Sequence, residues 1–131
     1  MSDLIVIKRK ESIMNIKQFS ELSGFSPDTL KYYEKIGLFD NIKRDPRGYR
    51  DYSKSEIEWA KFLNRLKTTG MSVKNMKKFT NLLKKGNSTI KERRKMLEEH
   101  QNAVLANLEK ITNMLEKIKY KIEFYKKLEK N

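Results

Sequence analysis

The strongest constraint on the fold is a regular apolar repeat in the C-terminal third of the chain. Hydrophobic residues recur at alternating steps of four and three from Val104 to Tyr125, and Ile90 and Leu97 extend the pattern towards the N-terminus. This spacing is typical of the a and d positions of a coiled coil, although the seam is polar at Arg94 and Gln101. We therefore expect one helix over residues 89–129, roughly 60 Å long.

Such a helix needs a partner for its apolar stripe. Residues 1–86 form too small a module to cover the stripe, so we predict a two-stranded coiled coil and hence a homodimer. Three β-branched residues fall at d and two leucines at a. Parallel dimers usually have β-branched residues at a and leucine at d, so this reversed order favours an antiparallel pairing. The predicted dimerisation residues are Leu97, Val104, Leu108, Ile111, Leu115, Ile118 and Ile122.

The net charge of +13 is concentrated before this helix. Residues 1–86 hold 19 Lys and Arg against 10 Asp and Glu, whereas residues 87–131 hold 11 against 7. An excess of this kind suggests a polyanionic partner, most simply nucleic acid, although compositional bias in a chain rich in Lys, Asn and Ile is the alternative.

Several classes of protein are excluded by what the sequence lacks. There is no cysteine, so disulfides and thiolate metal sites are excluded. No apolar run approaches 18 residues and no secretory signal is visible, so we expect no membrane span and a cytoplasmic protein. The single histidine, His100, follows Glu98 and Glu99, but adjacent residues diverge around a helix, so we predict no metal site. No nucleophile–base pair or phosphate-binding loop stands out, and we expect neither enzymatic activity nor a cofactor.

Two short helices are predicted near the N-terminus of the module. The first begins after Asn15, carries Ile16, Phe19 and Leu22 on one face, and ends at Gly24. The second spans 26–36 in the stretch "SPDTLKYYEKIGLF", with a serine cap, proline at the first helical position and a glycine stop. Two helices joined by a tight turn containing glycine make a helix-turn-helix, although a generic helical hairpin has the same pattern.

A basic hairpin is predicted next. The turn signature Asp45-Pro46-Arg47-Gly48 is flanked by residues suited to short strands. Such a hairpin after a helix-turn-helix is a wing. Its cations favour phosphate contact over a plain charged loop, and they are Lys43, Arg44, Arg47 and Arg50.

Two further helices complete the module. Ser53 and Glu56 form a capping box before one helix that ends at Gly70, and Ser72 caps another. Their apolar faces are expected to form core, and they hold Trp59, Phe62, Leu63, Leu66, Val73, Met76, Phe79 and Leu83. We thus divide the chain into an extension over 1–13 without assigned function, a DNA-binding module over 14–86, and a coiled-coil helix over 87–131.

The order of these elements resembles the MerR family of bacterial transcription regulators. "SPDTLKYYEKIGLF" is similar to the recognition-helix signature of that family, "RDPRGYRDYSKSEIEW" to its wing signature, and "RLKTTGMSVKNMKKF" to the segment that links the next two helices. The resemblance runs from about Met14 to Leu83. It implies a mainly α fold, a winged helix-turn-helix followed by a long dimerisation helix.

The resemblance also implies site residues. Helix 26–36 would lie in the major groove, with Tyr33 on a phosphate, and the wing would hold the flanking backbone. The predicted DNA-binding set is Ser26, Thr29, Lys31, Tyr32, Tyr33, Arg44, Arg47, Tyr49 and Arg50. Lys31 stands where the family usually has arginine, so base discrimination there is expected to be looser.

The implied function is a dimeric regulator that binds an inverted-repeat operator in double-stranded DNA and modulates initiation by RNA polymerase through distortion of the promoter. One alternative is an architectural or recombination-directing DNA-binding protein without an effector. Another is a coiled-coil adaptor with an incidental basic face, against which the wing signature argues. An effector would be a small molecule in a pocket near the junction of helix 72–86 with the coiled coil, or another protein, or absent.

Overall fold

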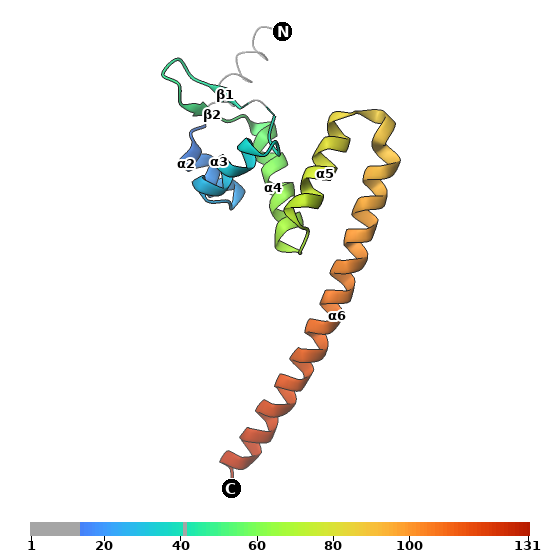
Figure 1. Ribbon diagram of the computed structural model, residues 1–131. Helices are drawn as coiled ribbons and strands as arrows, with labels where there is room; N and C mark the ends of the chain where they lie inside the picture. The colour runs from blue at the N-terminus through green and yellow to red at the C-terminus, as the bar shows by residue number, and fades with distance from the viewer. Residues whose placement is uncertain (1–13, 41) are drawn as a thin grey trace, which may run out of the picture. The chain divides into compact units, whose positions relative to one another are not determined.

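The computed structural model describes residues 14–40 and 42–131, and these residues form two compact units that divide after Gly86 (Figure 1). The extension predicted over residues 1–13 lies outside the described residues. The first unit holds the four helices α2 (Ile16–Ser23), α3 (Pro27–Lys35), α4 (Lys54–Thr68) and α5 (Val73–Lys84), together with strands β1 (Lys43–Arg44) and β2 (Arg50–Asp51). The second unit consists of the 3₁₀ turn η1 (Asn87–Thr89) and α6 (Ile90–Glu129). The fold is mainly helical, as predicted.

Side-chain caps fix where the helices of the first unit begin. Asn15 starts α2 and Ser53 starts α4, each in a complete capping box, while Ser26 and Ser72 accept the N–H of the residue three positions later at the starts of α3 and α5. After α3, Gly37 adopts a φ of 89°, and the N–H of Leu38 returns to the Tyr33 carbonyl at 2.9 Å. The short helices are therefore defined by their own sequence signals.

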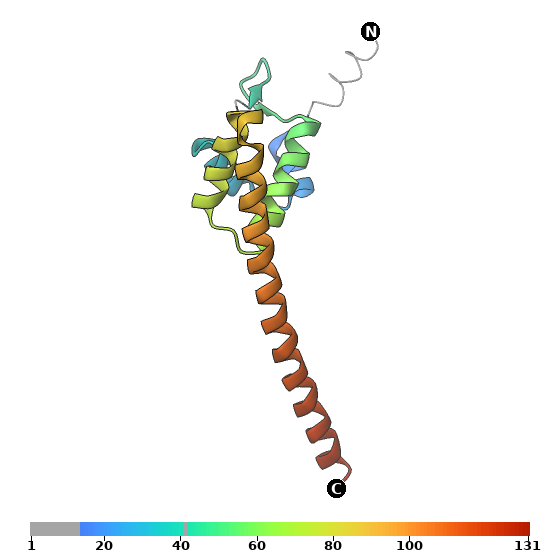
Figure 2. The same cartoon turned by 90° about the vertical axis from the view of Figure 1, so that its right-hand side faces the viewer.

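The core of the first unit joins the helix-turn-helix to the wing and to α4. The ring of Phe19 from α2 stacks on that of Tyr52, which follows β2, with centroids 4.0 Å apart, and it meets Phe39 edge-on at 6.0 Å. Helices α2 and α4 share the most contacts, and α4 lies beside α5 in both views (Figures 1 and 2). This packing holds α3 at one side of the module.

Two core positions differ from prediction. Leu22 is exposed and Ser23 is buried in its place, where its hydroxyl accepts the Phe25 N–H at 3.2 Å. Leu83 is partly exposed, whereas its neighbour Leu82 is buried. One step along a helix rotates a side chain by about 100°, so the identity of the buried neighbour depends on where the opposing helix lies.

The predicted wing is present as a two-stranded antiparallel hairpin. Lys43 pairs with Asp51 and Arg44 with Arg50. The turn between the strands is closed by the Gly48 N–H on the Asp45 carbonyl at 2.9 Å, and Gly48 has a φ of 88°. The prediction of a winged helix-turn-helix is thus confirmed.

The predicted long helix is also present. Helix α6 runs uninterrupted for 40 residues (Figure 2). None of its residues is buried. Most of the predicted seam is exposed in the single chain, as the side chains of Leu108, Ile111, Leu115, Ile118 and Ile122 show.

Candidate nucleic-acid interface

The start of α3 is set by Ser26, the capping residue before its first residue. Ser26 accepts the Thr29 N–H at 3.1 Å, and its hydroxyl donates to the Thr29 hydroxyl oxygen at 2.9 Å. These two predicted contact residues therefore define the start of the helix. Beyond them Lys31 and Tyr32 point outward, and the side chain of Tyr32 is 52% exposed.

The ring of Tyr33, unlike that of Tyr32, lies in the core. Only 2% of the residue is exposed, its ring meets Phe25 edge-on at 5.1 Å, and the Lys67 ammonium lies 5.7 Å from the ring centroid. The helical period is the reason, because Leu30 and Tyr33 are three residues apart and share the core face. The ring of Tyr33 therefore packs in the core, and the predicted phosphate contact would be made by its hydroxyl alone.

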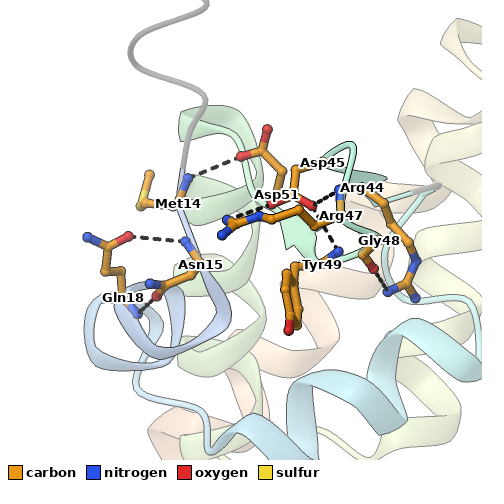
Figure 3. A network of polar contacts seen from close by, with 9 residues as sticks. All are labelled: Met14, Asn15, Gln18, Arg44, Asp45, Arg47, Gly48, Tyr49 and Asp51. Atoms are coloured by element: carbon orange, nitrogen blue, oxygen red, sulfur yellow. Dashed lines mark hydrogen bonds and ion pairs between the residues drawn. The ribbon is translucent and has the colours of Figure 1, made fainter.

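The tip of the wing presents a cation and an aromatic ring together. The Arg47 guanidinium lies 5.3 Å from the Tyr49 ring centroid, and Tyr49 is 65% exposed. Arg47 also bonds to Asp45 at 3.1 Å, and the N–H groups of Arg47 and Tyr49 both donate to the other oxygen of that carboxylate (Figure 3). One carboxylate thus orders the whole turn.

These contacts change the acidity of Asp45. Desolvation opposes its charged form, but the N–H bonds of Tyr49 and Arg47 and the nearby guanidinium outweigh that cost and lower the pKa of the carboxyl. Asp45 is therefore charged at neutral pH, and the turn is held in its closed form.

The other two arginines of the wing reach Glu34 of α3, and Arg44 also donates to the Gly48 carbonyl of the turn at 3.2 Å (Figure 3). Arg50 Nε donates to Glu34 Oε2 at 2.5 Å, and Arg44 lies 3.8 Å from the second oxygen of the same carboxylate. The Arg50 and Glu34 side chains are 24% and 21% exposed. Arg50, predicted as a backbone contact, thus holds the wing against α3. Glu34 was not among the predicted residues, although it lies within the recognition-helix motif, which was the signal that could have found it.

A broad open groove of about 840 Å³ brings most of the predicted residues together. Its lining comes from the start of α2, from α3 and from the wing, and its cations are Lys31, Arg44, Arg47 and Arg50. Two carboxylates also line it against these four cations: Asp45, which is paired with Arg47, and Asp51, which accepts the Met14 N–H at 3.2 Å. The groove is therefore positive on balance, which suits a phosphate backbone. Ser26, Thr29, Tyr32 and Tyr33 do not line it.

The predicted dimerisation residues lie along one helix, with Leu97 and Val104 partly buried and the rest exposed. Across residues 14–40 and 42–131, no helix could span a membrane. Within the same described residues, no group of three or more His, Cys, Asp or Glu could hold a metal ion.

The fold and the basic groove together define a winged helix-turn-helix protein of the DNA-binding class. A sequence profile of the MerR HTH family regulatory proteins matches residues 14–83, and the chain belongs to this family of transcriptional regulators. The family suggested by the sequence motifs is thus confirmed.

Individual relatives extend the similarity beyond the DNA-binding module. An uncharacterised HTH-type transcriptional regulator of Haemophilus influenzae is 35% identical over 108 residues, which cover 82% of this chain and 80% of that one. The HTH-type transcriptional regulator AdhR of Bacillus subtilis is 32% identical over 70% of this chain and 66% of its own. The crystal structure of HiNmlR, a MerR family regulator lacking the sensor domain and bound to promoter DNA, matches with a TM-score of 0.80 at 33% identity, over 88% of this chain and 91% of that one.

Proposed function

We propose that the protein is a homodimeric regulator that binds an inverted-repeat operator and alters transcription initiation by distorting promoter DNA. The observation that carries this proposal is the groove in which Lys31 of α3 and Arg44 and Arg47 of the wing converge. A helix and a basic hairpin placed side by side suit a major groove and the adjacent phosphates. The promoter DNA in the HiNmlR structure supports the same assignment.

The exposed seam of α6 supports the dimer. Five large apolar side chains from Leu108 to Ile122 are each about half exposed in one chain, and an apolar stripe at heptad spacing is the surface that a second helix covers. We assign dimerisation to Leu97, Val104, Leu108, Ile111, Leu115, Ile118 and Ile122, in the antiparallel pairing that the order of a and d residues favours. The expected partners are therefore double-stranded DNA, a second copy of the chain and RNA polymerase at the promoter, in the cytoplasm.

We assign the individual DNA contacts to the side chains of α3 and the wing that are exposed. Lys31 and Tyr32 project from α3 towards bases or phosphates, and Arg47 and Tyr49 present the wing tip to the backbone. Ser26 and Thr29 position the start of α3, and Arg50 acts through Glu34. This division separates groups that touch DNA from groups that hold them in place.

The test uses the native operator. Because two rigidly paired modules must meet half-sites in phase, inserting two base pairs rotates one site by about 70° and should weaken binding strongly. Circular-permutation mobility should reveal a central bend, supported by flexible pyrimidine–purine steps. In vitro transcription must then show a change of initiation at that promoter. Unchanged affinity across spacers and no effect on initiation would leave only an architectural DNA-binding protein.

A further inference from the structure

A second pocket lies on the first unit and shares no lining residue with the basic groove. Its volume is about 320 Å³, and its lining comes from the segment after α3, from the first turns of α4 and from the end of α5. Two helices and a turn that are far apart in the sequence thus line one open depression. The proposed DNA contacts make no use of it.

An aromatic ring forms the main apolar surface of this pocket. Trp59 is partly exposed there, beside the partly exposed Leu83. The ring of Phe79 lies parallel to the indole at 6.5 Å, and the indole N–H donates to the Leu38 carbonyl at 2.8 Å. Because its only donor is occupied, Trp59 offers a ligand the exposed part of its ring, beside Phe79 and Phe62, and not a hydrogen bond.

The charge of the pocket is opposite to that of the protein. In a chain of net charge +13, its lining holds the carboxylates of Asp40 and Glu56 and one ammonium, that of Lys84. Lys84 is already paired with Asp40 at 3.2 Å. Glu56 accepts the Ser53 N–H at 2.8 Å in the capping box of α4, a contact that leaves its negative charge in place. The lining therefore carries one negative charge in excess.

An indole face beside excess negative charge is a combination that attracts cations, because the ring quadrupole and the carboxylate act in the same direction. The geometry points to an effector site for a small organic cation with an apolar or aromatic body, such as an aryl amine or a quaternary ammonium. Trp59 and Leu83 receive the apolar body and Glu56 faces the positive charge. The binding of the cation does not depend on the proposed regulatory function. Only its effect on operator affinity rests on that function.

The consequence follows from what the pocket residues hold. Trp59 bonds the Leu38 carbonyl and Lys84 bonds the Gly37 carbonyl at 3.2 Å, and Leu38 in turn caps α3 through Tyr33. Two residues that line the pocket thus hold the segment between the end of α3 and the wing by hydrogen bonds. A ligand that binds the free and DNA-bound forms with different affinity changes operator affinity by the same factor.

The chain supplies its own reporter, because Trp59 is its single tryptophan. Three probes with the same aromatic body and different charge are benzyltrimethylammonium, benzyl alcohol and phenylacetate. We expect a saturable change of Trp59 emission with benzyltrimethylammonium below about 10 mM, a concentration that fragments of this size require. The neutral and anionic probes should bind at least about threefold more weakly, as one partly exposed charge pair implies.

The matched variant is Glu56→Gln, because glutamine preserves a capping box while removing the charge. It should bind benzyltrimethylammonium at least about threefold more weakly and bind operator DNA without probe as the wild type does. Saturating probe should shift the operator Kd of the wild type by about fivefold or more. The cation site is overturned if phenylacetate binds as tightly as benzyltrimethylammonium. It is also overturned if Glu56→Gln binds benzyltrimethylammonium as tightly as the wild type does. An emission change without a shift in operator affinity overturns its regulatory role, and the emission titration is independent of whether an operator exists.

Discussion

Arg50 of the wing donates through Nε to Glu34 of the recognition helix, and this contact ties together two elements that are separated by 16 residues in the chain. Both side chains are mostly withdrawn from water, so the pair is less screened than a surface salt bridge. Arg44 approaches the same carboxylate from the opposite strand. One acidic residue therefore sets the angle at which the wing stands beside α3.

The variant Glu34→Gln tests whether Glu34 acts by positioning the wing or only by its negative charge near the DNA. Removing a negative charge close to phosphates should by itself strengthen DNA binding, whereas loosening the wing should weaken it. We expect operator affinity to fall severalfold and stability to fall by about 1 kcal/mol. Fluorescence anisotropy on labelled operator and urea unfolding measure the two effects. Asp28→Asn is the control, because it removes the same charge from the start of α3, where no wing contact is made, and its affinity should hold or rise.

The salt dependence of binding reports phosphate contacts directly. Lys31→Ala and Arg47→Ala should each reduce the slope of log Kd against log salt by about 0.9, the value for one released counterion. Lys78→Ala, an exposed lysine of α5 outside the groove, is the control for loss of charge alone. Equal slopes for Arg47→Ala and Lys78→Ala would remove the wing tip from the interface.

Changes at Tyr33, which is buried, and at Tyr32, which is exposed, should have different consequences for operator affinity. Tyr33→Phe keeps the buried ring and removes only the hydroxyl, and we expect operator affinity to stay within about twofold, equivalent to about 0.4 kcal/mol. Tyr32→Ala removes an exposed side chain of α3 and should weaken binding by tenfold or so, a typical cost of about 1.4 kcal/mol for one lost contact. Competition titrations with unlabelled operator measure both. A large loss for Tyr33→Phe would show that its hydroxyl reaches DNA.

The proposed dimer contact along the seam of α6 can be tested by placing charged residues in it. Replacing Leu108 and Leu115 by lysine buries unpaired ammonium groups, which costs several kcal/mol, so the dimer should dissociate and operator binding should fall. Asn113→Lys adds a charge at the outer f position of the same heptad and should leave the dimer intact. Sedimentation at fixed concentration separates the variants. A persistent dimer in Leu108→Lys/Leu115→Lys would mean that another face pairs.

Helix orientation can be read from disulfides, because the chain has no cysteine of its own. Val104→Cys and Ile122→Cys are made as separate variants. An antiparallel pair brings at most one of these positions against its own copy, whereas a parallel pair brings both. Disulfide formation in both variants would therefore reverse the proposed orientation.

Tyr52 gives a prediction about alkaline pH. Burial raises the pKa of its hydroxyl to about 12 from its ordinary value of 10.0, with the charge of Arg50 opposing the rise, those of Glu34 and Glu56 adding to it and that of Arg44 opposing it. The folded state favours the neutral form, so stability is complete below pH 10 and declines between pH 10 and 12, by about 2 to 3 kcal/mol in total. Urea unfolding at pH 7 and pH 11 measures this decline.

Tyr52→Phe should remove that part of the pH dependence. At neutral pH it should stay within about 1 kcal/mol of the wild type, because the hydroxyl is buried without a hydrogen-bond partner among the described residues, and phenylalanine keeps the stack on Phe19. Tyr49→Phe, which alters an exposed ring, should decline with pH as the wild type does. A strong loss of stability in Tyr52→Phe at pH 7 would reveal a partner for the hydroxyl.

The sequence by itself determined the elements whose signals are local. Caps at Ser26, Ser53 and Ser72, the wing turn and the heptad repeat each depend on residues a few positions apart, so the helices, the hairpin and the long α6 could be predicted. The capping box at Asn15 is equally local, but it was found only in the structure. The family followed from the same motifs, since they fix residue types at set spacings.

Only the tertiary structure decided which face of each element is covered. Tyr32 and Tyr33 are adjacent and chemically identical, yet packing of α3 on Phe25 buries the second and exposes the first. Arg47 and Arg50 both belong to one basic hairpin, but Arg50 meets Glu34 and Arg47 stays at the tip. Periodicity gives the angle between neighbours on an element but not its rotation about its axis, which is set by distant residues that pack against it.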